Sequence, residues 1–235
     1  HSTPIKNLPI TAYRRFKNYL FQYPRVVLLE TVSICNLHCK HCFISDYGKI
    51  IPDGVKKILS FDEFVERAKL IKSVILKAEQ FQFTTFEPSM QKNLFKMMEY
   101  ILSINKKIKF PINTNAQLTT REFLNDLSHY PLYNFNVSLD GINKKTVEDF
   151  KTDTNFDKII ECLENVNRSN LNCDIGAVFV VHKNNLDELA DYPDFVSKYG
   201  VKNIYINNLL SFKKEFDFLT LYKKEGNSFV DDFFE

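Results

Sequence analysis

Short apolar segments alternate along the chain with longer segments whose apolar residues recur at helical spacing. The apolar segments have the length of buried strands, and they lie at residues 25–32, 81–86, 108–115, 133–140, 173–181 and 203–210. Segments of helical periodicity lie at 60–79, 90–104, 119–128, 156–169 and after Asn185. Buried strands that alternate with helices predict an α/β fold with a parallel sheet and right-handed crossovers.

Three helix starts have side chains suited to capping. Ser60 with Glu63 and Thr119 with Glu122 match the capping-box pattern, and Asn185 with Glu188 begins a further helix. The residues between 140 and 156 have the composition of a polar turn. An open doubly wound sheet and a partial (β/α) barrel both fit this order of elements, and periodicity does not choose between them.

Composition and charge exclude several classes of protein. The chain has 235 residues, a net charge of +2 and 26% charged residues of both signs. This balance gives no indication of nucleic acid binding. No run of about 18 apolar residues is present to span a membrane, and the first residues lack the apolar core of a secretory signal. We therefore expect a cytoplasmic protein, with neither a membrane nor a nucleic acid as its partner.

Polar residues gather where the predicted strands end. In parallel α/β folds, ligands bind at the carboxyl ends of the strands. The residues at these ends are Cys35, Cys39, Cys42, Thr84, Thr85, Phe86, Glu87, Asn113, Asn115, Ser138, Asp140, His182 and Asn207. His182 could face a substrate or be an ordinary surface histidine, and Asp140 is also a good turn residue. This edge of the sheet is the expected site.

Three of the five cysteines lie within eight residues, in the segment CNLHCKHC at 35–42. Such clustering, without a secretory signal, indicates a metal centre rather than a disulfide framework. Three thiolates leave one metal position open, as in an iron–sulfur cluster or a catalytic zinc site. Two alternatives are a helical stripe of thiols and a zinc site with His38 or His41 as the fourth ligand. Cys162 and Cys173 lie in apolar surroundings and are expected to be packing residues.

The motif Cys35-x3-Cys39-x2-Cys42, directly after the first strand, resembles the signature loop of the radical S-adenosylmethionine (radical SAM) superfamily. Four further segments match in order. FTTFEPSM is similar to the second-strand motif, INTNA to the third-strand Asn-Gly segment, VSLDG to the fourth-strand motif, and VVHKNNLDEL to the segment that leaves strand five. Five elements in register make the resemblance more specific than the cysteines alone.

The resemblance implies a partial (β/α)6 barrel at residues 25–210, after an N-terminal helical segment at 1–24 and before a tail or the start of an extension at 211–235. Cys35, Cys39 and Cys42 would hold a [4Fe–4S] cluster, with S-adenosylmethionine (SAM) bound at its open iron. Reductive cleavage of SAM would give a 5′-deoxyadenosyl radical that abstracts a substrate hydrogen. The implied SAM contacts are His41 beside the adenine, the Thr85 backbone, Glu87 at the methionine ammonium, and Asn115, Ser138 and Asp140 at the ribose or carboxylate.

The same resemblance implies a reductase or flavodoxin-type electron donor as a partner. A ribosomally made peptide is the first expected substrate, with a sugar, nucleotide or other small metabolite as the alternative. Two positions depart from the family pattern: Thr85 and Phe86 replace two glycines, and Ala116 replaces a third. The bulk of Phe86 would have to point away from the cofactor. Two rival functions therefore stay open, a non-catalytic partner or peptide-binding module and a zinc-stabilised binding domain.

Overall fold

Six parallel strands in sequence order form the centre of the protein. The computed structural model describes residues 24–39, 42, 58–210 and 214–221. The strands are β1 (Val26–Leu28), β2 (Gln80–Gln82), β3 (Phe110–Thr114), β4 (Leu132–Ser138), β5 (Asp174–Val181) and β6 (Asn203–Asn208). β1 pairs with β2, and β3 to β6 pair in sequence order. A parallel bridge between Gln80 and Lys109 joins the two sets. Because the strand order never reverses, the doubly wound alternative is excluded and the sheet is a partial barrel.

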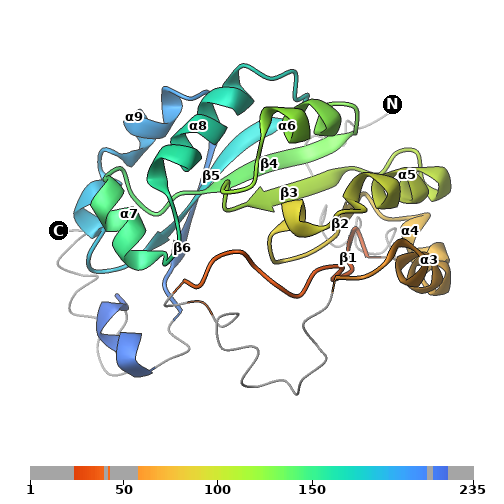
Figure 1. Ribbon diagram of the computed structural model, residues 1–235, viewed down its shortest axis with the longest axis horizontal. Coiled ribbons are helices and arrows are strands. Elements are labelled where there is room, and N and C mark those ends of the chain that lie inside the picture. The colour runs from red at the N-terminus through yellow and green to blue at the C-terminus, as the bar shows by residue number, and fades with distance from the viewer. Residues whose placement is uncertain (1–23, 40–41, 43–57, 211–213, 222–235) are drawn as a thin grey trace, which may run out of the picture.

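The helices lie outside the curved sheet, and the segment that follows β1 runs past the strand ends toward β6 (Figure 1). The α-helices are α3 (Phe61–Leu70), α4 (Lys72–Ile75), α5 (Leu94–Ile104), α6 (Arg121–Leu127), α7 (Lys144–Phe150), α8 (Phe156–Asn167) and α9 (Tyr192–Ser197). The 3₁₀ helices are η2 (Pro88–Met90), η3 (Leu186–Leu189) and η4 (Lys214–Leu219). Within the described ranges, none of these helices has the length and apolar character needed to cross a membrane.

The helix caps confirm one sequence prediction and correct two. Ser60 and Glu63 form the predicted capping box at the start of α3. The start of α6 is capped by Thr120 rather than Thr119, through a hydrogen bond from the backbone N–H of Phe123. Asn185 makes no side-chain cap at η3.

The segment predicted as a polar turn contains a helix, α7. Its sequence KKTVEDF has two apolar residues, Val147 and Phe150, and both are buried. Because two apolar residues are too few to establish a period, the pattern did not indicate this helix. α7 matters for the site because Lys151, directly after it, reaches the end of β4.

Pro111 lies inside β3 without breaking it. The register with β4 shifts between Phe110 and Pro111, which is the irregularity that proline requires in a strand. On the other side of β3, the pairing with β2 is limited to the single bridge at Lys109. Despite the missing N–H of Pro111, the pairing of β3 with β4 continues beyond the shift as far as Thr114 and Val137.

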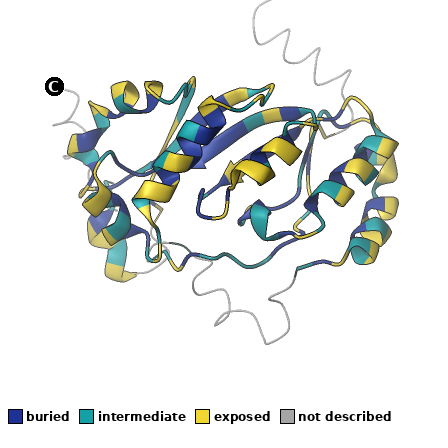
Figure 2. Cartoon of the chain, turned by 45° about the horizontal axis from the view of Figure 1, so that its top comes forward, coloured by how far each residue is buried: buried dark blue, intermediate teal, exposed yellow. Residues whose placement is uncertain are grey.

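Buried residues gather on the sheet and on the helix faces that cover it (Figure 2). Phenylalanines fill the core at the β2 and β3 side. The rings of Phe81 and Phe83 lie 4.9 Å apart between centroids, and those of Phe83 and Phe110 lie 5.4 Å apart. Cys162 is also buried in this core, as predicted, while Cys173 is half-buried and packs against it. The strand ends are thus positioned by a rigid apolar interior.

The tail returns to the barrel beside α7. Leu219 in η4 is buried with Phe150 and Leu209, and Phe216 packs against them. The backbone N–H of Lys183, after β5, donates to the carbonyl of Leu219 at 3.0 Å. Phe218, by contrast, is 64% exposed. The predicted N-terminal helical segment at 1–24, apart from Pro24, and most of the predicted tail at 211–235 lie outside the described residues.

Candidate functional site

A pocket of about 480 Å³ opens at the carboxyl ends of the strands. Its lining residues are Cys35, Thr85, Phe86, Glu87, Asn113, Thr114, Asn115, Asn136, Ser138, Val178, Tyr205 and Asn207. Eight of the residues predicted at the strand ends therefore meet here, from β1, β2, β3, β4 and β6 or the loops that follow them. We call this the cofactor pocket. His41 was also predicted for the site and lies outside the described residues.

The strand register explains the floor of the cofactor pocket. Asn113, Asn136 and Gly176 lie side by side on β3, β4 and β5. The Asn136 amide donates to the Asn113 side-chain oxygen at 2.8 Å. A Cβ at Gly176 would lie 2.1 Å from the Asn136 side-chain oxygen. Glycine at this position therefore makes room for the pair of amides.

The three clustered cysteines lie close enough to affect one another. Burial raises the pKa of the Cys35 thiol and raises that of Cys39 to about 12, and the neighbouring Cys42 raises both further. The backbone N–H of Leu37 and the side chain of Asn115 donate to the Cys35 sulfur at 3.5 Å and 3.6 Å. Three thiols in one segment, with N–H donors at the Cys35 sulfur, have the chemistry of ligands to an iron–sulfur cluster.

Two features of the cysteine segment bear on its alternatives. Residues 35–39 are not helical, so the alternative of a helical stripe of thiols is excluded. Within the part of the chain that is described, no three His, Cys, Asp or Glu side chains are arranged to hold a metal ion, and this includes the cysteine segment.

The cysteine segment is tied to the barrel at two points. The Asn115 amide donates to the Asn36 side-chain oxygen at 2.9 Å. On the other side, the backbone N–H of His38 donates to the Thr152 carbonyl at 3.4 Å, and the His38 ring pairs with Asp153 at 2.7 Å. His38 therefore anchors the segment to the connection after α7, a role that the sequence did not indicate.

Glu87 joins the ends of β2 and β3. It is 2% exposed, and its two carboxylate oxygens divide four donors unequally. One oxygen accepts from the backbone and hydroxyl of Ser89 and from the Thr114 hydroxyl, at 3.3, 2.6 and 2.8 Å. The other oxygen accepts from the backbone N–H of Asn115 at 2.8 Å. Burial raises the pKa of Glu87, and these donors partly lower it again.

Thr85 and Phe86 stand where the family pattern has two glycines before Glu87, and a second glutamate, Glu30, binds this segment. The Thr84 hydroxyl donates to Glu30 at 2.8 Å, and the backbone N–H of Thr85 donates to the same carboxylate at 3.0 Å. Phe86 is also one of the residues that line the cofactor pocket. The sequence did not indicate Glu30, because it precedes the cysteine segment and belongs to no recognisable motif.

Ala116 keeps the backbone of the glycine that it replaces. Its φ is 68°, in the left-handed region that non-glycine residues rarely adopt. The side chain is buried, and the backbone N–H donates to the Thr114 hydroxyl at 3.0 Å. The turn after β3 is therefore preserved at some cost in stability.

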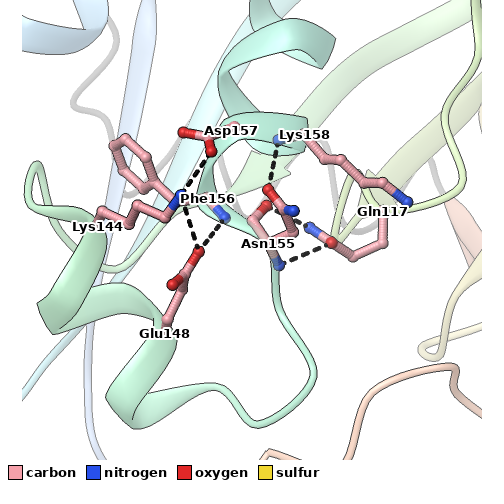
Figure 3. A network of polar contacts seen from close by, with 7 residues as sticks. All are labelled: Gln117, Lys144, Glu148, Asn155, Phe156, Asp157 and Lys158. Carbon is pink, nitrogen blue, oxygen red and sulfur yellow. Dashed lines mark hydrogen bonds and ion pairs between the residues drawn. The ribbon is translucent and has the colours of Figure 1, made fainter.

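The same turn is held from the side of α8. Asn155 caps this helix, and its backbone N–H donates to the Gln117 side-chain oxygen at 2.9 Å. The Gln117 amide in turn donates to the Asn155 carbonyl at 3.2 Å. Figure 3 shows this reciprocal pair beside the contacts of α7 with the start of α8. Asn115, two residues before Gln117, is thereby fixed in position.

Asp140 does not line the cofactor pocket, so the expectation that it contacts the ligand is wrong. Its carboxylate is fully buried and forms an ion pair with Lys151 at 2.9 Å. It also accepts the backbone N–H of Val180 at 2.9 Å. Lys151 additionally donates to the Ser138 hydroxyl at 2.7 Å. Asp140 is therefore connected to the pocket through Lys151 and Ser138, and its charge also helps to raise the pKa of Cys39.

His182 lies neither in the cofactor pocket nor on the surface. It is 1% exposed and does not line the cofactor pocket. Asn185 and Glu188 also have structural roles. The Asn185 amide donates to the carbonyls of Asp140 and Val180 at 2.8 Å and 3.0 Å. Glu188 accepts the backbone N–H groups of Ile142 and Asn143.

The model of the radical SAM superfamily matches residues 29–196, which is more than half of the chain. The chain belongs to this superfamily. The family match and the six-stranded arrangement together confirm the fold that the sequence motifs implied. A radical SAM protein uses a [4Fe–4S] cluster and SAM, so these two expected cofactors are confirmed at the level of the family.

Two curated relatives cover most of this radical SAM chain. Molybdenum cofactor biosynthesis protein 1 of Dictyostelium discoideum is 26% identical over 230 residues, which is 94% of this chain and 35% of that protein. Mycofactocin maturase MftC of Mycolicibacterium smegmatis is 25% identical over 182 residues, which is 75% of this chain and 43% of that protein. The chain thus spans less than half of the length of either relative.

Among solved structures, Streptococcus suis SuiB bound to S-adenosylmethionine has a TM-score of 0.65 and 18% identity, covering 94% of this chain and 50% of SuiB. SuiB bound to its precursor peptide SuiA gives a TM-score of 0.64 at 18% identity, covering 94% of this chain and 48% of SuiB. At this identity the likeness establishes the fold.

We expect Ala116→Gly to stabilise the protein by up to about 1 kcal/mol. The left-handed backbone costs a non-glycine residue about 1–2 kcal/mol, and the added freedom of glycine in the unfolded chain offsets about 0.4–1 kcal/mol of the gain. Urea denaturation measures the difference. Ala177→Gly, at a fully buried position in β5, is the matched control and should destabilise. Equal destabilisation by both substitutions would contradict the strained turn.

Glu87→Gln should change the pH dependence of stability. Burial raises the pKa of Glu87 in the folded state, so the wild type loses stability relative to the variant as the pH rises from the ordinary Glu value through the raised pKa. Urea titrations between about pH 4 and pH 8 measure this difference.

Glu122→Gln is the control of opposite sign. Hydrogen bonds from its own backbone and from Thr120 lower the pKa of Glu122, so the wild type should lose stability relative to this variant as the pH falls. Parallel curves for the wild type and Glu87→Gln would show that the Glu87 carboxyl titrates normally.

Proposed function

We propose that this chain is an enzyme that holds a [4Fe–4S] cluster on Cys35, Cys39 and Cys42 and cleaves SAM reductively. The observation that carries the proposal is that Cys35, Glu87, Asn115 and Ser138 meet in one pocket at the strand ends. When bound, the cluster would supply the electron that splits the sulfonium of SAM into methionine and a 5′-deoxyadenosyl radical, which abstracts a substrate hydrogen.

The cysteine segment would hold the cluster through thiolates. Burial disfavours a free thiolate at Cys39, so the charge of iron is needed to keep these sulfurs deprotonated. The N–H donors of Leu37 and Asn115 at the Cys35 sulfur would stabilise the bound form further.

Glu87 would accept the methionine ammonium. A carboxylate is the suitable partner for a charged donor, and one oxygen of Glu87 has only the Asn115 backbone N–H as a donor. Because a carboxylate oxygen has two acceptor positions, this oxygen can accept another hydrogen bond without losing its present one. The buried position would also exclude water from the contact.

Ser138 would bind the methionine carboxylate. Its hydroxyl oxygen accepts from Lys151, which leaves the hydroxyl hydrogen free to donate. Lys151, fixed by Asp140, would act as a positioning residue for Ser138. The proposed contacts of the Thr85 backbone, Asn115 and His41 follow from the family resemblance.

We propose a peptide as the substrate. The names of the relatives support this choice, since one is a maturase and SuiB was solved with a precursor peptide. Among the described residues, the lining of the cofactor pocket includes Asn113, Asn136, Tyr205 and Asn207 and no Lys or Arg. Such groups suit the uncharged amides of a peptide better than a phosphate, which is usually bound by cations or backbone N–H groups.

The proposal includes a cytoplasmic location and a protein electron donor. None of the five cysteines forms a disulfide, which agrees with a reducing, cytoplasmic compartment. A reductase or flavodoxin-type protein would deliver the electron. The rival, a non-catalytic partner module, is motivated by the replaced glycines before Glu87.

Cysteine substitutions test the cluster ligands. After anaerobic reconstitution with iron and sulfide, the wild type and Cys162→Ala should hold about four irons per chain and be brown, because Cys162 lies in the core. Cys39→Ala should lose most of this iron and colour. Iron and sulfide analysis with visible absorption measures the outcome. One equivalent of zinc without sulfide, or loss of colour only in Cys162→Ala, would overturn the assignment.

Cleavage of SAM tests the activity. The cluster-loaded protein, reduced with dithionite, should produce 5′-deoxyadenosine and methionine from SAM, measured by chromatography. Glu87→Gln should reduce the rate at low SAM concentration by about tenfold or more, because it removes one charge-assisted hydrogen bond. A cluster-loaded wild type that forms no 5′-deoxyadenosine would favour the non-catalytic module.

A further inference from the structure

A second pocket, of about 470 Å³, lies between α7, the end of β5 and η4. Its lining residues are Lys145, Thr146, Asp149, Phe150, His182, Asn184, Phe216, Phe218 and Leu219. None of them lines the cofactor pocket. We call it the α7 pocket. Its volume lies within the range that small-molecule sites occupy in proteins.

The imidazole of His182 is the feature that indicates a ligand. The backbone N–H of Asn184 donates to its Nδ1 at 3.2 Å, so Nδ1 is an acceptor and the ring hydrogen lies on Nε2. His182 is 1% exposed, and Nε2 is buried without a hydrogen-bond partner. A buried N–H group of this kind is costly to leave unpaired.

The ring of His182 is held in place by its surroundings. The Phe150 ring lies 3.8 Å from it between centroids. The backbone N–H of His182 donates to the Asn185 side-chain oxygen at 2.7 Å. Burial lowers the pKa of His182, which keeps the imidazole neutral and its tautomer defined. Nε2 is therefore a fixed single donor, suited to an uncharged or anionic acceptor.

The other lining groups define the rest of the ligand. Phe216, Phe218 and Leu219 present apolar surface from η4, and Phe218 is 64% exposed. Lys145 is exposed, and the structure gives its ammonium no partner among the described residues. Donors and the Asp149 carboxylate thus stand beside aromatic rings, as in sites that orient an apolar molecule through a few polar contacts.

We propose that the α7 pocket binds a small molecule with an aromatic body and a carbonyl or carboxylate oxygen, which accepts a hydrogen bond from Nε2–H of His182. The apolar body lies against Phe216 and Phe218. The ammonium of Lys145 favours the carboxylate form over the neutral carbonyl form. This binding is independent of the proposed cleavage of SAM, since no residue of the cofactor pocket takes part.

Three probes of equal shape test the proposal on the full chain labelled with ¹⁵N at its five histidines. Phenylacetate and phenylacetamide carry an acceptor oxygen, while phenethylammonium carries only donors. Long-range ¹H–¹⁵N spectra report the tautomer and the Nε2 shift, and the His182 signals are identified by their loss in His182→Gln.

We expect the free protein to have the ring hydrogen on Nε2. Phenylacetate should move the Nε2 signal and slow the exchange of its hydrogen, phenylacetamide should do the same more weakly, and phenethylammonium should leave it unchanged. A hydrogen on Nδ1, no response to either acceptor, or an equal response to all three probes would overturn the proposal.

A variant away from the histidine keeps the test valid if His182→Gln fails to fold. Phe218→Ala should weaken the binding of phenylacetate several-fold without changing the tautomer of His182. Leu70→Ala, at a position that is 85% exposed on α3, is the matched control and should not change binding. Unchanged affinity in Phe218→Ala would place the ligand outside the α7 pocket.

Discussion

The buried carboxylate of Glu87 is the contact on which the cofactor pocket depends. Glu87 follows β2 and accepts hydrogen bonds from Thr114 and Asn115 at the end of β3, so it joins the ends of these two strands directly. Asn115 carries the connection to the loop after the first strand through the Cys35 sulfur and Asn36. A buried charge is stable only where donors surround it. The packing of the strand ends and the position of the cysteine segment are therefore parts of one polar network.

Loss of the glycines has not removed the conformations that they support. Ala116 adopts a φ of 68°, and the two threonines before Phe86 hold their bend through Glu30. At Ala116 the left-handed backbone costs conformational free energy. At the two threonines, hydrogen bonds to Glu30 hold the segment in place of the freedom that glycine would give. Phe86, however, lines the pocket at a position where the family pattern has glycine. Ala116 thus preserves a left-handed backbone, whereas Phe86 places a large residue in the lining of the pocket.

The fold and the centre of the site were predictable because their signals are local. Strand periodicity, turn residues and the spacing of Cys35, Cys39 and Cys42 can each be read from a few neighbouring residues. Other features depend on residues that meet only in three dimensions. α7 has two apolar residues, and Lys151 is a common surface residue until its partners Asp140 and Ser138 are known. Asp140 matched a motif, but the motif does not reveal whether a carboxylate faces a ligand or a lysine.

Some polar side chains of the site use all their donors and acceptors within the protein and position other residues. Others keep a donor or acceptor that could bind a ligand. Asn115 uses both amide hydrogens, on Cys35 and Asn36, and its oxygen accepts from Gln117. A ligand could claim this amide only by displacing an existing contact, so Asn115 mainly fixes the cysteine segment. Ser138 keeps an unused hydroxyl hydrogen, and one oxygen of Glu87 keeps an unused acceptor position. These two groups lie on the same pocket, and together they match the ammonium and the carboxylate of an amino acid such as the methionine part of SAM.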